Sequence, residues 1–122
     1  MKKELLVITG PIASGKTKIA RDIANYLARG GNVRWALTDE LKGEWESLKP
    51  AIDNGPHSVI IIDEVSYSEI DTVANFLSHE YSELPRYIII LSQDRQVTDY
   101  IKEHQAANAV NKALITIEKS TL

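Results

Sequence analysis

The stretch from Leu5 to Thr17, LLVITGPIASGKT, constrains the fold of this chain more than any other part of the sequence. A short apolar run leads into a loop bounded by Gly10 and Gly15, and Lys16 follows directly. The loop fits the pattern G-x-x-x-x-G-K-[ST]. Apolar residues at helical spacing continue beyond it. We therefore predict a buried strand, a tight loop and an amphipathic helix, which is the context that this pattern requires.

Each residue type in this loop suits the binding of phosphate. Glycine allows positive φ angles and a close approach of the backbone to a ligand. Successive N–H groups and the positive end of the following helix then attract an anion. Lys16 is predicted to reach the terminal phosphates and to act in catalysis, and Thr17 to ligate Mg²⁺. The predicted nucleotide-binding residues are Gly10, Pro11, Ile12, Ala13, Ser14, Gly15, Lys16 and Thr17. The alternative interpretation is an ordinary glycine-containing turn before a helix.

Strand-like and helix-like segments alternate along the rest of the chain. Besides the first strand, strands are predicted at 32–38, 58–65, 87–91 and 113–118, and helices at 16–29, 41–48, 70–81 and 98–107, with a capping box at 68–71. This alternation predicts an α/β fold of three layers, α/β/α, in which helices cover both faces of a five-stranded, mainly parallel sheet. We expect residues 1–122 to form a single domain.

A second motif lies in the segment SVIIIDEV, residues 58–65. Four β-branched apolar residues predict a fully buried strand, and Asp63 and Glu64 come directly at its end. Ligands of parallel sheets bind at the carboxyl ends of the strands, so these acids should face the glycine loop. Asp63 suits the binding of Mg²⁺, and Glu64 suits the activation of a water molecule as a general base. The alternative interpretation is a strand that ends in a solvated acidic turn.

Three segments together, GPIASGKT at 10–17, IIIDE at 60–64 and IIILSQ at 88–93, resemble the P-loop NTPases with an additional catalytic glutamate, the AAA+ and RecA-like group. The resemblance implies the strand order 5-1-4-3-2, Mg-ATP as the ligand, and a polar sensor residue after the fourth strand. Ser92 or Gln93 is the match for that sensor.

The chain departs from AAA+ proteins in two respects. No residues follow Leu122 that could form a helical lid, so we expect a minimal core. No arginine lies just before the last predicted strand, where the family has an arginine finger; Lys112 is the nearest cation. We therefore expect an ATPase that is slow alone and works with a protein partner or as a homo-oligomer. Arg95 is placed to supply a cation at the carboxyl edge of the sheet, whereas Arg86 precedes its strand at the opposite edge.

Two other functions fit the same motifs. A small nucleoside or nucleotide kinase would use the loop and the acids in the same way and could bind its acceptor through Asp39. A nucleotide-binding module that regulates a larger ATPase would explain the missing lid and finger. A GTPase is disfavoured, because Asn111-Lys112 is followed by Ala113-Leu114 and the guanine-reading pattern N-K-x-D is absent.

Composition bounds the remaining possibilities. No apolar run approaches the roughly 18 residues needed to span a bilayer, and the first residues do not form a signal peptide, so we expect no membrane partner and a cytoplasmic location. The chain has no cysteine and a net charge of −3, which gives no global attraction to nucleic acid. Trp35 and Trp45 suit either a core or the stacking of a base, and the scattered histidines His57, His79 and His104 have no ligand spacing.

Overall fold

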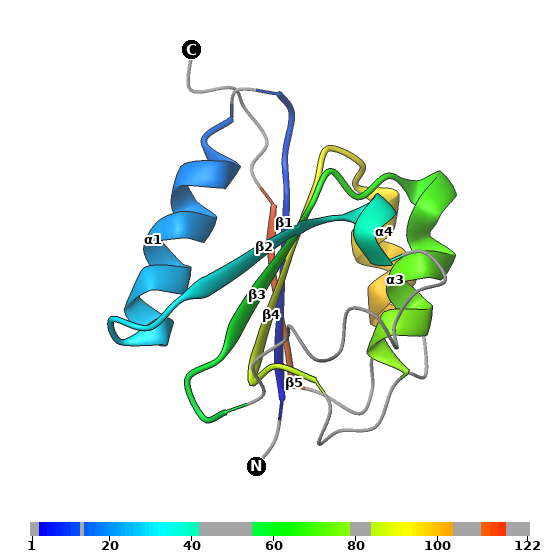
Figure 1. Ribbon diagram of the computed structural model, residues 1–122. Helices are drawn as coiled ribbons and strands as arrows, with labels where there is room; N and C mark the ends of the chain where they lie inside the picture. Colours follow the sequence, from blue (N-terminus) through cyan, green and yellow to red (C-terminus); the bar gives the residue numbers. More distant parts are fainter. Residues whose placement is uncertain (1–2, 13, 42–54, 79–83, 104–110, 117–122) are drawn as a thin grey trace.

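The computed structural model describes residues 3–12, 14–41, 55–78, 84–103 and 111–116. Helices and strands alternate along the chain, as expected for an α/β protein (Figure 1). The elements are β1 (Glu4–Thr9), α1 (Lys16–Ala28), β2 (Val33–Leu37), the 3-10 turn η1 (Thr38–Leu41), β3 (Val59–Asp63), the 3-10 turn η3 (Tyr67–Glu69), α3 (Ile70–Leu77), β4 (Tyr87–Ser92), α4 (Gln96–Glu103) and β5 (Asn111–Thr116).

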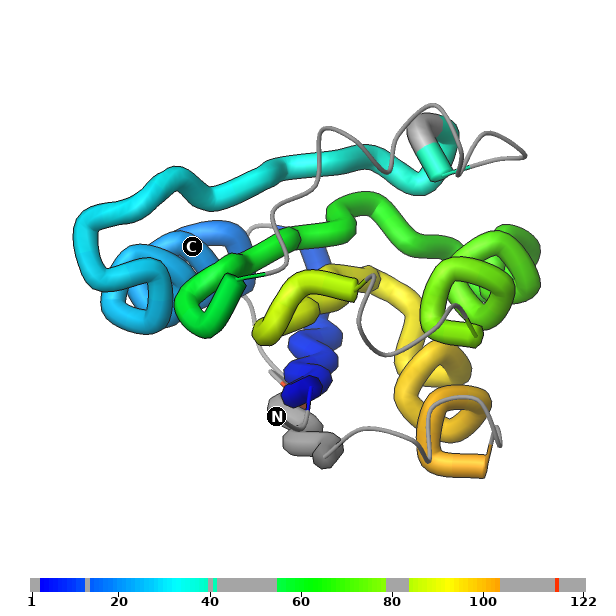
Figure 2. Tube along the Cα trace, turned by 60° about the horizontal axis from the view of Figure 1, so that its bottom comes forward, coloured from blue at the N-terminus to red at the C-terminus, as the bar shows by residue number. Residues whose placement is uncertain are grey.

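The strands form one parallel sheet in the order β2-β3-β4-β1-β5. Helix α1 covers one face of the sheet, and α3 and α4 lie together on the other (Figure 1). Figure 2 shows the same three layers from another direction, with α1 apart from α3 and α4. The predicted α/β class and parallel sheet are confirmed. No described helix is long and apolar enough to cross a membrane.

Both faces of the central strands are buried, which explains their continuous apolar sequences. Alternate residues point to opposite faces, so Ile60 and Ile62 of β3 pack on the side of α3 and α4, and Ile61 packs on the side of α1. Helix α1 meets the sheet through an alanine stripe at every fourth position. The stripe consists of Ala20, Ala24 and Ala28, all of which are buried. Small side chains at this spacing allow close packing of the helix on the sheet.

The structure differs from the sequence predictions mainly at element ends. The predicted capping box at 68–71 is wrong, because η3 occupies 67–69 and Glu69, not Ser68, is the N-cap of α3, without a side-chain cap. Ser66 contacts the Ser68 hydroxyl at 2.9 Å and Glu69 Oε1 at 3.3 Å instead. The last strand begins at 111 and not at 113, α4 begins at 96 and not at 98, and most of the predicted helix at 41–48 lies outside the described residues.

The two-sided core predicts a large cost for truncating a central side chain. Ile61 is 0% exposed between β3 and α1, and Ile→Ala substitutions at such positions cost about 2–5 kcal/mol, since they remove apolar contact and leave a cavity. We expect Ile61→Ala to lower the free energy of unfolding in urea by that amount. Tyr26→Ala, at a side chain that is 83% exposed on α1, is the matched control and should stay within about 0.5 kcal/mol. Equal effects of the two substitutions would contradict the packing described here.

Candidate functional site

The glycine loop connects β1 to α1 and is tied to the neighbouring strand β4. The Gly10 N–H donates to the carbonyl oxygen of Ser92 at 3.1 Å, and the Ser14 N–H donates to the carbonyl oxygen of Pro11 at 3.2 Å. Gly15 has φ 89° and is the N-cap residue of α1. A side chain at this φ is strained, so glycine is needed where the loop turns into the helix.

The start of α1 has the features of an anion site. Gly15 provides no side-chain cap and the first turn holds no acidic residue, so the first N–H groups of the helix point out toward a hollow. Lys16 Nζ lies 3.2 Å from the carbonyl oxygen of Pro11, folded across the loop. The Ser14 side-chain oxygen is buried and has no hydrogen-bond partner among the described residues. The hollow measures about 330 Å³ and is lined by Ser14, Gly15, Lys16, Thr17, Lys18 and Arg21.

The two acids lie at the end of β3, on the same sheet edge as the loop. Strand β4 separates β3 from β1, so the two strand ends are about 10 Å apart, or two strand spacings. Asp63 Oδ1 accepts the N–H of Glu64 at 2.7 Å, which fixes the carboxylate. Glu64 has φ 56°, the left-handed region that costs a non-glycine residue about 1–3 kcal/mol, and its side chain is exposed.

Ser92 joins the end of β4 to the segment after Glu64. It is 1% exposed, and its hydroxyl donates to the carbonyl oxygen of Val65 and accepts the N–H of Asp94 at 3.0 Å. The Val65 N–H also donates to the carbonyl oxygen of Leu91 at 3.1 Å. Gln93, in contrast, is exposed at the sheet edge. Of the two predicted sensor residues, Gln93 is therefore the one whose side chain is accessible to a ligand, whereas Ser92 holds the edge together.

Three residues at this edge were missed by the sequence predictions. Thr38 Oγ1 donates to the carbonyl oxygens of Asp63 at 3.4 Å and Glu64 at 3.5 Å, which supports the acidic turn. Asp94 accepts the N–H groups of Gln96 at 3.0 Å and Tyr67 at 3.2 Å, so it fastens the start of α4 to η3. An acid two residues before a helix is a recognisable capping signal. Arg21 was missed because its position beside the loop depends only on the direction in which α1 leaves the loop.

The two arginines considered as cation sources lie at opposite edges. Arg95 is exposed just before α4, on the same edge as the loop. Arg86 pairs with Glu4 at 3.4 Å and lies over the Tyr87 ring at 4.8 Å, at the amino edge. Burial, and then the charge of Arg86, lower the pKa of Lys3 at that same edge. Arg86 is therefore remote from the loop.

Most predicted site residues lie along the carboxyl edge of the sheet. These are Gly10, Pro11, Ile12, Ser14, Gly15, Lys16, Thr17, Asp63, Glu64, Ser92 and Gln93. Ala13 lies outside the described residues, and Asp39 is an exposed residue of the turn η1 after β2. No cluster of three acidic, histidine or cysteine residues suited to a metal occurs in the described part of the chain. A Mg²⁺ site of one carboxylate, one hydroxyl and ligand phosphates does not need such a cluster.

Comparison with known proteins gives no family for this chain. No family model matches the sequence, and no curated protein matches it either.

The hydrogen bonds of Ser92 predict a structural cost that Gln93 does not share. Ser92→Ala leaves the Val65 carbonyl and the Asp94 N–H without their buried partner, which typically costs about 1–3 kcal/mol. We expect urea unfolding to show this loss, while Gln93→Ala changes stability by less than about 0.5 kcal/mol. Unchanged stability of Ser92→Ala would show that its hydroxyl does not hold the two loops together.

Proposed function

We propose that this chain is a Mg-ATP-binding P-loop ATPase core of the AAA+ or RecA-like type, which hydrolyses ATP slowly on its own. One observation carries the proposal: the loop at 10–17 leads into the start of α1 at the same sheet edge as Asp63 and Glu64. Read from β5, the strand order is β5-β1-β4-β3-β2, the order that the resemblance implies, and this supports the proposal.

The loop accounts for the binding of the phosphates. The exposed N–H groups at the start of α1 would donate to phosphate oxygens, and the buried Ser14 hydroxyl would gain the partner that it lacks. Lys16 would exchange the carbonyl of Pro11 for the terminal phosphates, a stronger, charge-assisted contact. Thr17 and Asp63 are the residues that would hold Mg²⁺, which neutralises charge on the phosphates when bound.

Hydrolysis requires a base and a cation near the terminal phosphate. Glu64 is exposed at the edge and would accept a proton from water, with Gln93 as the residue beside it that could orient that water. The cation that would stabilise the transferring phosphate is the part of the site that this chain supplies least well. A partner protein or a second copy of the chain would supply it, or Arg95 would do so from the same edge. Slow hydrolysis by the isolated chain follows from this weakness.

The role of Lys16 can be tested by binding alone. We expect Lys16→Ala to weaken Mg-ATP binding by roughly 10- to 150-fold, the equivalent of about 1.5–3 kcal/mol for a charge-assisted hydrogen bond, with unchanged stability. Calorimetric titration with Mg-ATP measures this directly. Lys102→Ala, on α4, is the control with equal loss of charge and should bind like the parent. Parental affinity in Lys16→Ala would rule out the P-loop role of this residue.

The role of Glu64 separates binding from chemistry. Glu64→Gln should bind Mg-ATP like the parent but release phosphate roughly 10²- to 10⁴-fold more slowly, the usual effect of losing a general base. An unaltered rate of hydrolysis in Glu64→Gln would show that Glu64 is not the general base.

Phosphate release by the parent chain is measured across protein concentrations, and its specific activity should rise as copies associate. Phosphate transfer to an added nucleoside would favour a kinase, and binding without turnover at any concentration would favour a regulatory module.

A further inference from the structure

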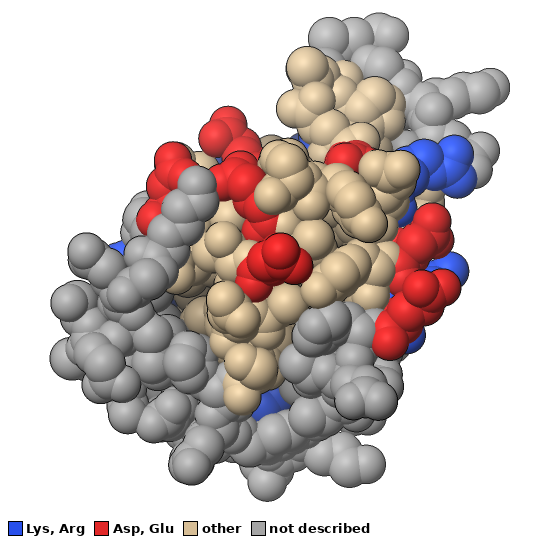
Figure 3. Space-filling view, turned by 90° about the vertical axis from the view of Figure 1, so that its right-hand side faces the viewer, with Lys and Arg blue, Asp and Glu red and all other residues tan. Residues whose placement is uncertain are grey.

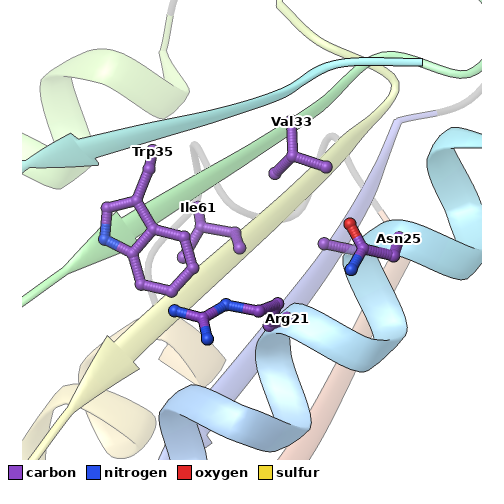
Figure 4. Close-up of a pocket in the computed structure, with 6 residues that line it drawn as sticks. Arg21, Asn25, Val33, Trp35 and Ile61 are labelled. Carbon is purple, nitrogen blue, oxygen red and sulfur yellow. The ribbon is translucent and has the colours of Figure 1, made fainter. Parts of the chain in front are cut away.

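A second hollow lies between α1 and the strands β2 and β3, next to the phosphate loop. It measures about 180 Å³ and is lined by Arg21, Ala24, Asn25, Val33, Trp35 and Ile61. Figure 4 shows Arg21 and Asn25 reaching from α1 toward Trp35 and Val33, with Ile61 between them. Arg21 also lines the hollow at the loop, so the two spaces adjoin along one side of α1.

The chemistry of this hollow suits a flat aromatic ring. Trp35 is only half-buried, and the guanidinium of Arg21 lies 5.8 Å from the centre of its ring, within cation–π range. Val33 is partly exposed and provides apolar surface, with the buried Ile61 behind it, and the exposed amide of Asn25 offers a donor and an acceptor at the rim. The volume is well below the roughly 300–1,000 Å³ of pockets that enclose whole ligands. The hollow therefore has room for one ring system and not for a complete nucleotide.

We propose that this hollow binds a nucleobase by stacking it on Trp35, with Arg21 over the ring and Asn25 at its edge. Aromatic side chains and arginine are the groups that hold unpaired bases, and an amide pairs with base edges. The positive charge of Arg21 favours a nucleotide over a neutral nucleoside. The base can belong to a free nucleotide or to a single strand, since both present the same ring.

This base belongs to a second ligand and not to the ATP at the loop, a step that rests on the proposed function. Lys16, Thr17 and Asp63 would draw the terminal phosphates toward β3, so the adenosine end of ATP points away from β3. The hollow lies under β2 and β3, on the side of the terminal phosphates. A base bound there would lie beside the reacting end of ATP.

Surface charge also favours this side of the molecule. Figure 3 shows the face that carries α3 and α4, where Asp and Glu side chains outnumber Lys and Arg among the coloured residues. The side of α1 instead offers Arg21 at this hollow, and Lys16 and Lys18 at the adjoining hollow of the loop, although Lys18 pairs with Asp22 at 3.1 Å. An anionic nucleotide is therefore attracted to the α1 side even though the net charge is −3.

The experiment uses Trp35 as its own reporter. In a Trp45→Phe background Trp35 is the single tryptophan, and stacking of a base should quench its fluorescence. The chain is titrated without ATP with adenosine monophosphate, with thymidine monophosphate and with a short oligothymidylate. Ribose 5-phosphate, which carries the phosphate but no base, is the matched control. We expect saturable quenching by the base-containing ligands alone. Tighter binding of the oligothymidylate than of the monophosphates identifies a strand as the source, and the reverse identifies a free nucleotide.

Variants separate the hollow from the loop and from simple loss of fold. Trp35→Leu should weaken binding of the best ligand by roughly 5- to 150-fold, measured by calorimetry, whereas Trp35→Phe keeps a stacking face and should lose less. Asn25→Ala provides a second test at an exposed side chain. Arg34→Lys, next to Trp35 on the opposite face of β2, should bind like the parent. Lys16→Ala should keep base binding while it loses ATP.

Three results would overturn the proposal. Quenching by ribose 5-phosphate as strong as by the nucleotides would show an anion effect without base recognition. Unchanged affinity in a folded Trp35→Leu variant would show that the ring does not bind there. Quenching by ATP that disappears in Lys16→Ala, with no quenching by the other ligands, would place the base of ATP itself in the hollow. Failure of the parent chain to bind Mg-ATP, with base binding retained, would instead count only against the function proposed for the loop.

Discussion

The position of β4 between β1 and β3 is the constraint on which the candidate site depends. Its last two residues hold the glycine loop and the acidic turn: the carbonyl of Leu91 accepts the N–H of Val65, and the carbonyl of Ser92 accepts the N–H of Gly10. Because β4 is buried on both faces, water does not compete for these bonds. The end of one strand thus fixes the distance between the glycine loop and the acids. A shift of β4 along the sheet would separate them.

The features that could be predicted from the sequence are those set by local pattern. Apolar runs such as 59–62 are buried strands because no alternating polar residue offers a solvent face, and the glycine loop must sit between a strand and a helix. The features that could not be predicted depend on tertiary contacts. Side chains alternate between the two faces along β4, so Ile88, Ile90 and then Ser92 point toward the side of α3 and α4. Ser92 is therefore buried under Val65, while Gln93, beyond the end of the strand, is exposed. Sequence alone treats these two neighbours as equivalent.

Three locally unfavourable features lie at this same edge. Glu64 has a left-handed φ of 56°, Gly15 one of 89°, and Ser14 buries a hydroxyl without a partner in the described structure. Similar features also occur elsewhere in the described structure: Arg29, at the far end of α1, has φ 49°, and Arg86 Nη1 is buried without a hydrogen bond. Under the proposed function, a phosphate oxygen that accepted the Ser14 hydroxyl would offset part of the cost of burying it.

Arg21 gives the two hollows a physical connection. Thr17, Arg21 and Asn25 lie four residues apart and so share one side of α1, with the loop at one end and Trp35 at the other. Only one guanidinium serves both spaces. Under the two proposals, a base stacked on Trp35 would hold Arg21 away from the phosphates, and phosphates that drew Arg21 to the loop would take its charge away from the stacked base. Linkage then requires that each ligand weaken the other by the same factor. Any favourable coupling between the ligands must therefore come from charge or contacts other than Arg21. The coupling that remains in Arg21→Ala measures those other contributions, and its difference from the parent measures the contribution of Arg21.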